Sequence, residues 1–189
     1  MIGRLPKTLE IGGKNYEIRS DFRDVLRIYE AFDDKSLTPQ EQAYICLVNI
    51  YPDYGSFATQ EELQEAVDKA YWFVGGGDTP QSKPEKTKMI DWKQDENILF
   101  PAINKVAGFE VREIAYMHWW TFLGLFGEVG EGLFTAVMNI RQKKARGKAL
   151  EKYEEEFYRK NKHLIDIKTP EDIEAEEELN EVFNSLFGE

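Results

Sequence analysis

The sequence predicts a mainly α-helical fold, a multi-helix bundle of seven or eight helices with a short N-terminal β-hairpin. Three observations predict it. Apolar residues recur three and four positions apart through most of the chain, as on the buried face of a helix. Many of these stretches begin at a Ser, Thr or Asp that can cap a helix. Near the N-terminus, two alternating apolar–polar segments flank a Gly-Gly pair, which is the pattern of a hairpin.

The predicted hairpin occupies residues 8–18. Apolar and polar residues alternate in Thr8–Ile11 and in Lys14–Ile18, and Gly12 and Gly13 lie between them. Glycine readily adopts the positive φ that a two-residue hairpin turn requires. Because a lone hairpin is only marginally stable in water, we expect it to pack on another part of the chain or to pair with another chain.

Capping signals place most of the helices. The first three begin after Ser20 or Asp21, at Thr38 and at Thr59, and the second start is a capping box with proline at the first helical position. Pro101 should kink the fourth helix or move its start. Later helices are expected over Asp91–Val106, from about Val111, over Leu133–Arg141, over Lys148–Lys160, and as an acidic helix after Thr169.

We expect residues 1–168 to form a single, mainly helical domain and residues 169–189 to form an acidic C-terminal helix or tail. Residues 75–90 are rich in glycine, proline and lysine, the composition of a mobile loop. Each flank of this loop holds too few apolar residues to be stable alone. A loop within one domain is therefore favoured over a linker between two.

Composition argues against several functional classes. The net charge of −11 disfavours nonspecific nucleic-acid binding, because contacts to phosphate need clustered Lys and Arg. The single cysteine, Cys46, cannot form an intramolecular disulfide. The chain starts without the apolar core of a signal peptide, and the uncharged run 114–127 is shorter than the roughly 20 residues that span a bilayer. We therefore expect a cytoplasmic protein without a membrane contact.

Neither a metal site nor a nucleophile is indicated. His118 and His163, the two histidines, have no His, Cys or carboxylate at the spacing of a ligand motif. Cys46 lies between two apolar residues, as a small buried thiol does. The sequence therefore predicts no metal and no other cofactor.

Three acids, Asp91, Asp95 and Glu96, share one turn of the chain. Two of them could act as a general acid and a general base. We interpret them instead as solvated acids at the start of a helix, where the helix dipole favours negative charge. With this interpretation the chain offers no catalytic residues, and we do not expect an enzyme.

The aromatic stretch supplies the first candidate partner-binding residues, Tyr116, Trp119, Trp120 and Phe122. Adjacent residues on a helix diverge by about 100°, so the two tryptophans cannot face the same way. Core packing is the simplest explanation for one of them. Large aromatics on two faces are nevertheless more than a small monomer usually needs, and we interpret the surplus as a contact with a partner or a second copy of the chain.

A basic segment supplies the other candidates, Arg141, Lys143, Lys144 and Arg146. Residues 141–168 hold ten Lys or Arg and five Asp or Glu, whereas residues 171–189 hold eight acids and no base. Within residues 141–148, no aromatic residue interleaves with the cations, as a single-strand nucleic-acid binder would require. Two interpretations stay open: a solvated connection between helices, or a contact with an acidic partner or with the chain's own tail.

Four segments resemble the gene-product-fifteen family of tailed phages and prophages of Gram-positive bacteria. They are Leu9–Arg23, Met117–Gly124, Ile140–Lys148 and Leu150–Tyr158. The resemblance covers nearly the whole chain except the last twenty residues. It implies a role in tail morphogenesis, because such genes tend to lie between those of the major tail protein and the tape measure protein.

The resemblance further implies a noncatalytic tail assembly chaperone. Such a protein would bind the tape measure protein, keep it soluble and help to recruit tail-tube subunits of the major tail protein. It would act in the host cell cytoplasm, with a homo-oligomer among its expected assemblies, and would be absent from the mature virion. Two alternatives stay open: a structural virion component such as a tail or connector subunit, and, ranked lower, an acidic DNA mimic that inhibits a host enzyme.

Overall fold

The computed structural model describes residues 3–78, 88–169, 172–175 and 178. Eight α-helices, one 3-10 helix and one hairpin can be delimited among these residues, and they confirm the mainly α fold class. In chain order they are β1 (Thr8–Ile11), β2 (Lys14–Glu17), α1 (Phe22–Asp33), α2 (Pro39–Ile50), η1 (Tyr54–Ser56), α3 (Gln60–Val74), α4 (Glu96–Ala107), α5 (Trp119–Gly127), α6 (Leu133–Ala145), α7 (Lys152–Lys160) and α8 (Lys162–Ile165).

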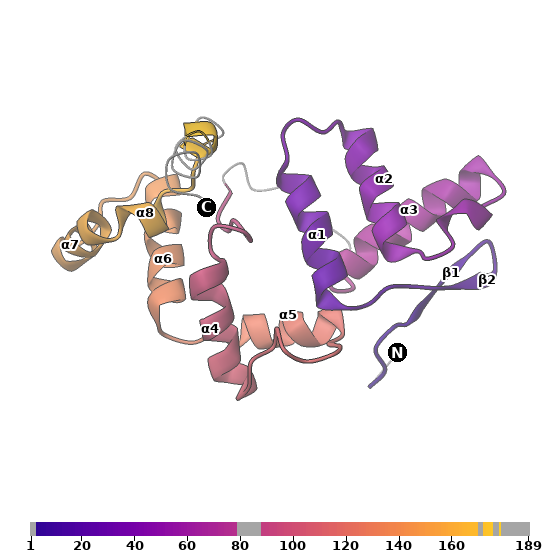
Figure 1. Ribbon diagram of the computed structural model, residues 1–189, viewed down its shortest axis with the longest axis horizontal. Helices are drawn as coiled ribbons and strands as arrows, with labels where there is room; N and C mark the ends of the chain where they lie inside the picture. Colours follow the sequence, from indigo (N-terminus) through magenta and orange to yellow (C-terminus); the bar gives the residue numbers. More distant parts are fainter. Residues whose placement is uncertain (1–2, 79–87, 170–171, 176–177, 179–189) are drawn as a thin grey trace, which may run out of the picture.

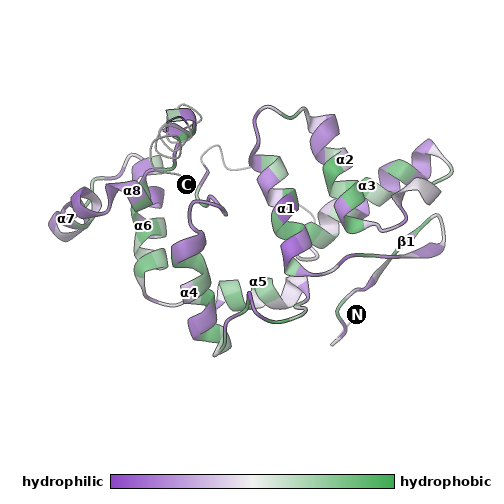
Figure 2. Cartoon of the chain, in the orientation of Figure 1, coloured by the Kyte–Doolittle hydropathy of each residue, from purple (hydrophilic) through white to green (hydrophobic). Residues whose placement is uncertain are grey.

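The helices form an arch with two lobes (Figure 1). The hairpin and α1–α3 make the N-terminal lobe, while α4, α6, α7 and α8 make the C-terminal lobe. Helix α5 crosses the base of the arch and contacts both α1 and α4. Apolar residues are frequent along α4, α5 and α6, whereas α7 is mostly hydrophilic (Figure 2). Buried apolar residues of both lobes belong to one continuous cluster.

The hairpin packs on α3. Its strands pair in the register Leu9 to Tyr16 and Ile11 to Lys14, with the Gly12-Gly13 turn at φ 56° and 77°. Leu9 and Ile11 are buried on the face that contacts α3. The backbone N–H of Gly12 also donates to a carboxylate oxygen of Glu65 in α3 at 2.9 Å. Of the two expected arrangements, the structure shows the hairpin packed on its own chain.

The first three helix starts are confirmed. The Asp21 side chain accepts the backbone N–H of Arg23 at the start of α1. Thr38 and Glu41 form the complete capping box of α2, and Thr59 accepts the N–H of Glu62 at the start of α3. These side chains occupy backbone donors that have no partner within the first turn of a helix.

Helix α5 begins at Trp119 and not near Val111, because the chain before it pairs with the segment that enters α1. The N–H of Phe22 donates to the carbonyl of Met117 at 3.0 Å, and the N–H of Trp119 donates to the carbonyl of Ser20 at 2.8 Å. The residues immediately before α5 therefore use backbone groups in hydrogen bonds to a distant segment instead of a helix. Apolar spacing along the chain does not reveal such a long-range pairing.

Other helix boundaries also differ from the prediction. Helix α4 begins at Glu96 and not at Asp91, and it continues through Pro101 to Ala107. Helix α6 continues four residues past Arg141, to Ala145, and α7 begins at Lys152. The terminal residues of a helix depend on capping contacts, which are set by neighbours in space.

Both predicted irregular segments lie partly outside the described residues. Residues 79–87 of the expected loop at 75–90 are not described. On its near side, Gly77 has φ 93°, and a Cβ there would approach the Trp120 ring to 3.0 Å, so this position needs glycine. Of the expected acidic tail, Thr169 exchanges hydrogen bonds with Asp172, and residues 172–175 are helical and exposed.

His118 caps α5 and ties it to the N-terminal segment. Its Nδ1 accepts the backbone N–H of Trp120 at 3.1 Å, so the ring proton is on Nε2, which donates to the carbonyl of Pro6 at 2.8 Å. Burial lowers the pKa of His118, and nearby Lys7 lowers it further, although the bond to Pro6 opposes them. A proton on Nδ1 would break the cap, since two donors would then face each other.

We predict that His118 makes the fold sensitive to acid. Its pKa in the folded chain lies below the value near 6.5 of an unfolded histidine, so its stabilisation is complete above about pH 6.5 and is lost as the pH falls through the folded pKa. Urea unfolding at about pH 7.5 and pH 5.5 measures this loss. His118→Asn, which keeps a capping oxygen, should show a smaller pH dependence, and equal dependence in both proteins would refute this role.

Candidate functional site at the junction of the two lobes

One aromatic ring from each of three helices meets at the junction. Phe122 of α5 stacks on Phe22 of α1, with centroids 4.5 Å apart and planes 4° apart. Phe100 of α4 lies 6.1 Å from Phe122 and 6.4 Å from Phe22. All three rings are buried. Stacked and tilted aromatic pairs contribute beyond the burial of their area, so these rings fix α5 between the lobes.

Trp119 attaches α5 to the end of α3. Its side chain has no exposed surface, and its indole N–H donates to the carbonyl of Val74 at 2.8 Å. The ring also stacks on Phe122 at 5.7 Å and lies 5.8 Å from Tyr29 of α1. The last carbonyls of a helix lack partners within it, so Trp119 satisfies an acceptor of α3 while filling the core.

Trp120 repeats this contact on the neighbouring face of α5 but stays partly exposed. Its indole N–H donates to the carbonyl of Phe73 at 2.9 Å. The ring packs edge-on against Trp72 at 5.3 Å and stacks on Phe73 at 6.0 Å. The two adjacent tryptophans thus use diverging directions to hold the same end of α3.

Tyr116 lies in the extended segment before α5, with 46% of its surface exposed. Its hydroxyl shares a hydrogen bond with the Ser20 hydroxyl at 2.8 Å, and Lys7 lies 5.7 Å from the ring centroid. These three residues line a shallow depression of about 280 Å³ beside the hairpin. The aromatic face of Tyr116 is accessible to a partner.

The four aromatic candidates therefore divide into two pairs. Trp119 and Phe122 have no exposed surface and contact only their own chain in the folded state. Trp120 and Tyr116 retain accessible ring surface. The surplus of aromatics on two faces of α5 has an internal cause, because α5 has to pack against both lobes at once.

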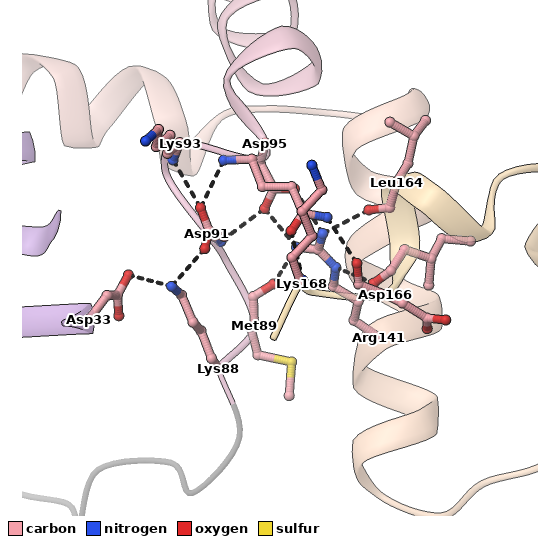
Figure 3. Close-up of polar contacts among 12 residues, drawn as sticks. Asp33, Lys88, Met89, Asp91, Lys93, Asp95, Arg141, Leu164, Asp166 and Lys168 are labelled. Carbon is pink, nitrogen blue, oxygen red and sulfur yellow. Dashed lines mark hydrogen bonds and ion pairs between the residues drawn. The ribbon is translucent and has the colours of Figure 1, made fainter. Parts of the chain in front are cut away.

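Arg141 is buried at the centre of the C-terminal lobe (Figure 3). Its guanidinium forms a two-pronged ion pair with Asp95, with N–O distances of 2.6 and 2.8 Å. The other donors reach the carbonyls of Met89, Leu164 and Ile165 at 2.7 to 2.9 Å. All five N–H donors of the side chain are thereby satisfied.

The burial of this ion pair contradicts two interpretations of the sequence. Asp95 is not a solvated acid, because its side chain is 1% exposed against Arg141. Arg141 is 4% exposed and is not available to a partner in the folded chain. A signal for this was present in the sequence: Phe134, Val137 and Arg141 follow the spacing of one helix face, so Arg141 belongs to the buried face of α6.

A polar chain links this ion pair to the N-terminal lobe. The same Asp95 carboxylate accepts the backbone N–H of Asp91 at 3.0 Å, and Lys88 joins Asp91 at 2.8 Å to Asp33 of α1 at 2.9 Å (Figure 3). Burial alone would raise the pKa of Asp91. Hydrogen bonds from Gln94, Lys88 and Lys93 outweigh it and lower that pKa. The sequence does not reveal this link, since no local pattern connects Asp33 with Lys88.

The remaining basic candidates lie at the end of α6. Lys143 reaches both carboxylate oxygens of Glu154 in α7 at 2.6 and 2.7 Å, and this contact lowers the pKa of Glu154. Lys144 pairs with Asp166 at 2.5 Å and lies over the Tyr158 ring at 3.9 Å. Arg146 is exposed and makes no ion pair with any described residue.

The groups that could carry chemistry are mostly committed to the fold. Burial raises the pKa of the Cys46 thiol to about 12, which keeps it protonated. His118 uses both ring nitrogens in structural hydrogen bonds. Across the described ranges, no three His, Cys, Asp or Glu side chains gather as metal ligands, and no helix there is long and apolar enough to cross a membrane.

Comparison with known families matches residues 1–167 to the model described as bacteriophage Gp15 protein. The chain belongs to this family. It is therefore a bacteriophage protein, and its family indicates a structural or assembly-related role. No curated protein and no solved structure matches the chain. The matched range ends one residue before the boundary predicted at residue 168.

In this Gp15 family member, Arg141→Met should lower the free energy of unfolding by about 3–5 kcal/mol, because Asp95 is left buried without a counter-charge. Asp95→Asn added to Arg141→Met should cost less than the two single changes summed, since no lone charge remains. Lys144→Met is the control, with an expected cost below about 1 kcal/mol for a half-exposed pair. Additive costs in urea unfolding would contradict the proposed coupling.

The two tryptophans should differ in their effect on stability. Trp119→Ala should cost about 3–5 kcal/mol, a large part of the total for a domain of this size. Trp120→Ala should cost less, because part of its ring is already in contact with water. Thermal or urea unfolding followed by circular dichroism compares them. An equal or larger loss for Trp120→Ala would show that its ring surface is needed for the core.

Proposed function

We propose that this chain is a noncatalytic tail assembly chaperone that binds the tape measure protein and helps to recruit tail-tube subunits. The observation that carries the proposal is membership of the bacteriophage Gp15 family over residues 1–167. The residue roles support it, because the cysteine, His118 and the buried Arg141–Asp95 pair all serve the fold. What remains at the surface is suited to contacts with another protein.

A partly exposed aromatic face supports binding of a helical client. The Trp72 ring of α3 packs against Trp120 of α5, Leu123 follows one helical turn later in α5, and all three side chains are only partly buried. We call these three residues the Trp120 face. Amphipathic helices bind partners by laying apolar side chains on such a surface, and tryptophans often dominate the binding energy. The Trp120 face is our candidate contact for apolar side chains of the tape measure protein.

The net charge of the chain and the binding of many copies along one client fit the same role. A net charge of −11 keeps a complex with an apolar client dispersed through repulsion between bound copies. Many copies along one long client would bind durably even with weak individual contacts, because each bound segment holds its neighbours near their sites. We propose that this occurs in the host cell cytoplasm and that the chain is absent from the finished virion.

Co-expression with the tape measure protein of the same phage tests the proposal. We expect the client to stay soluble and to elute together with this chain in size-exclusion chromatography. An insoluble client without a co-eluting complex would refute the chaperone role. Mass spectrometry of purified virions separates it from a structural component, which would be found in the particle in stoichiometric amounts.

Variants locate the client surface. Trp120→Ala and Leu123→Ser, checked for folding by circular dichroism, should each weaken client binding, by about 30-fold where the side chain is a hot spot worth 2 kcal/mol. Tyr44→Ala is the matched control, since Tyr44 is an aromatic residue 55% exposed on α2, away from α5. Loss of binding with Tyr44→Ala alone would move the client surface to α2.

A further inference from the structure

The C-terminal lobe carries a group of exposed cations. Arg146, Lys148, Lys152, Arg159 and Lys162 are exposed, and none forms an ion pair with a described residue. We call these five residues the basic surface. The other four cations of residues 141–162 each have a carboxylate partner. Among the described residues of this segment, the cations thus divide into those with a carboxylate partner and those that form no ion pair.

Internal ion pairs gather the basic surface around one corner of the lobe. Lys143 holds the end of α6 to α7 through Glu154, and Lys144 holds it to Asp166, just after α8. The five cations lie at the end of α6, on the connection to α7, near the two ends of α7 and at the start of α8. Helices α6, α7 and α8 are on the left of Figure 1. Tyr153 lies next to Lys152 on α7 and, at 66%, is the most exposed large apolar side chain in the described ranges.

The end of the chain has the complementary chemistry. Residues 171–189 contain eight acids and no base. Their apolar residues follow the spacing of one helix face: Leu179, Val182, Phe183, Leu186 and Phe187. The described start of this segment caps a helix at Thr169 and leaves Ile173 43% exposed. Aromatic and aliphatic side chains there could contact Tyr153 while the acids meet the cations.

The short covalent connection between α8 and residues 171–189 favours this contact. Thr169 follows three residues after Asp166, which Lys144 binds beside the basic surface. Exposed ion pairs contribute only about 0.2–1 kcal/mol each. A short covalent link raises the local concentration of the segment to the millimolar range, so several such weak pairs together suffice for docking.

We propose that residues 171–189 dock on the basic surface of their own chain. Docking neutralises this cationic corner of an acidic protein and covers Tyr153. It keeps this corner from binding other polyanions, because the tethered acids occupy it first. The inference stands apart from the chaperone role, since it concerns α6–α8 and involves neither the Trp120 face nor a client.

A spin label on the tail of the full chain tests the proposal. Ser185→Cys introduces a site that labels selectively, because the native Cys46 is buried with its pKa raised to about 12. We expect selective loss of amide NMR signal at residues 146–153 and 159–162. The loss should disappear in 1 M salt, where screening acts within about 3 Å.

Charge-reversal variants test whether the contact depends on the cations of the basic surface and the acids of the tail. Lys148→Glu, Lys152→Glu and Arg159→Glu together should abolish the signal loss, and Glu177→Lys, Glu178→Lys and Glu181→Lys in the tail of that variant should restore it. The matched control reverses three exposed lysines elsewhere, Lys14, Lys69 and Lys105, and should leave the loss unchanged. Equal sensitivity to the control would reduce the effect to net charge and overturn the proposal.

Two further outcomes would also overturn it. Signal loss at another surface, or none, would show that the tail does not dock on α6–α8. In a mixture, spin-labelled chain without ¹⁵N could also reduce the amide signals of ¹⁵N chain that carries no spin label. If it does, and if the signal loss disappears at high dilution, the contact is with a second copy. Concentration-independent loss confined to the basic surface supports docking within one chain.

Discussion

The packing of α5 between the lobes is the contact on which the rest of the structure depends. Phe122 stacks on Phe22 of α1 and lies against Phe100 of α4, so one side chain joins both halves of the arch. Trp119 and Trp120 hold the end of α3 from the adjacent faces. Large, stiff aromatic rings suit such a joint, because each contacts several neighbours while losing few rotatable bonds on ordering.

A polar contact has the corresponding role inside the C-terminal lobe. Arg141 joins Asp95, at the start of α4, to carbonyls at the end of α8, and Lys88 extends the chain of contacts to α1. Removing two charges from water is costly, so a buried pair adds little net stability. It does specify geometry, because five donors in a rigid plane are satisfied only when α4, α6 and α8 lie in one arrangement.

These two contacts separate structural from available residues. Trp119, Phe122 and Arg141 are buried and contact only their own chain, whereas Trp120, Tyr116 and Arg146 retain accessible surface. We propose that the aromatic and charged side chains that stay accessible contact other proteins. The aromatic and basic parts of its surface lie in different places, on α3–α5 and on α6–α8, so they can serve different contacts.

The sequence by itself determined the fold class, the Gly-Gly hairpin and the starts of α1, α2 and α3, because each depends on side chains within a few residues of the backbone they cap or bend. It also showed the charge contrast between residues 141–168 and the tail. Only the tertiary structure decided that Asp95 is buried, that Arg141 faces inward, and that Met117 and Trp119 pair with the entry to α1. These features join segments far apart in the chain, where local spacing carries no information about which groups will meet.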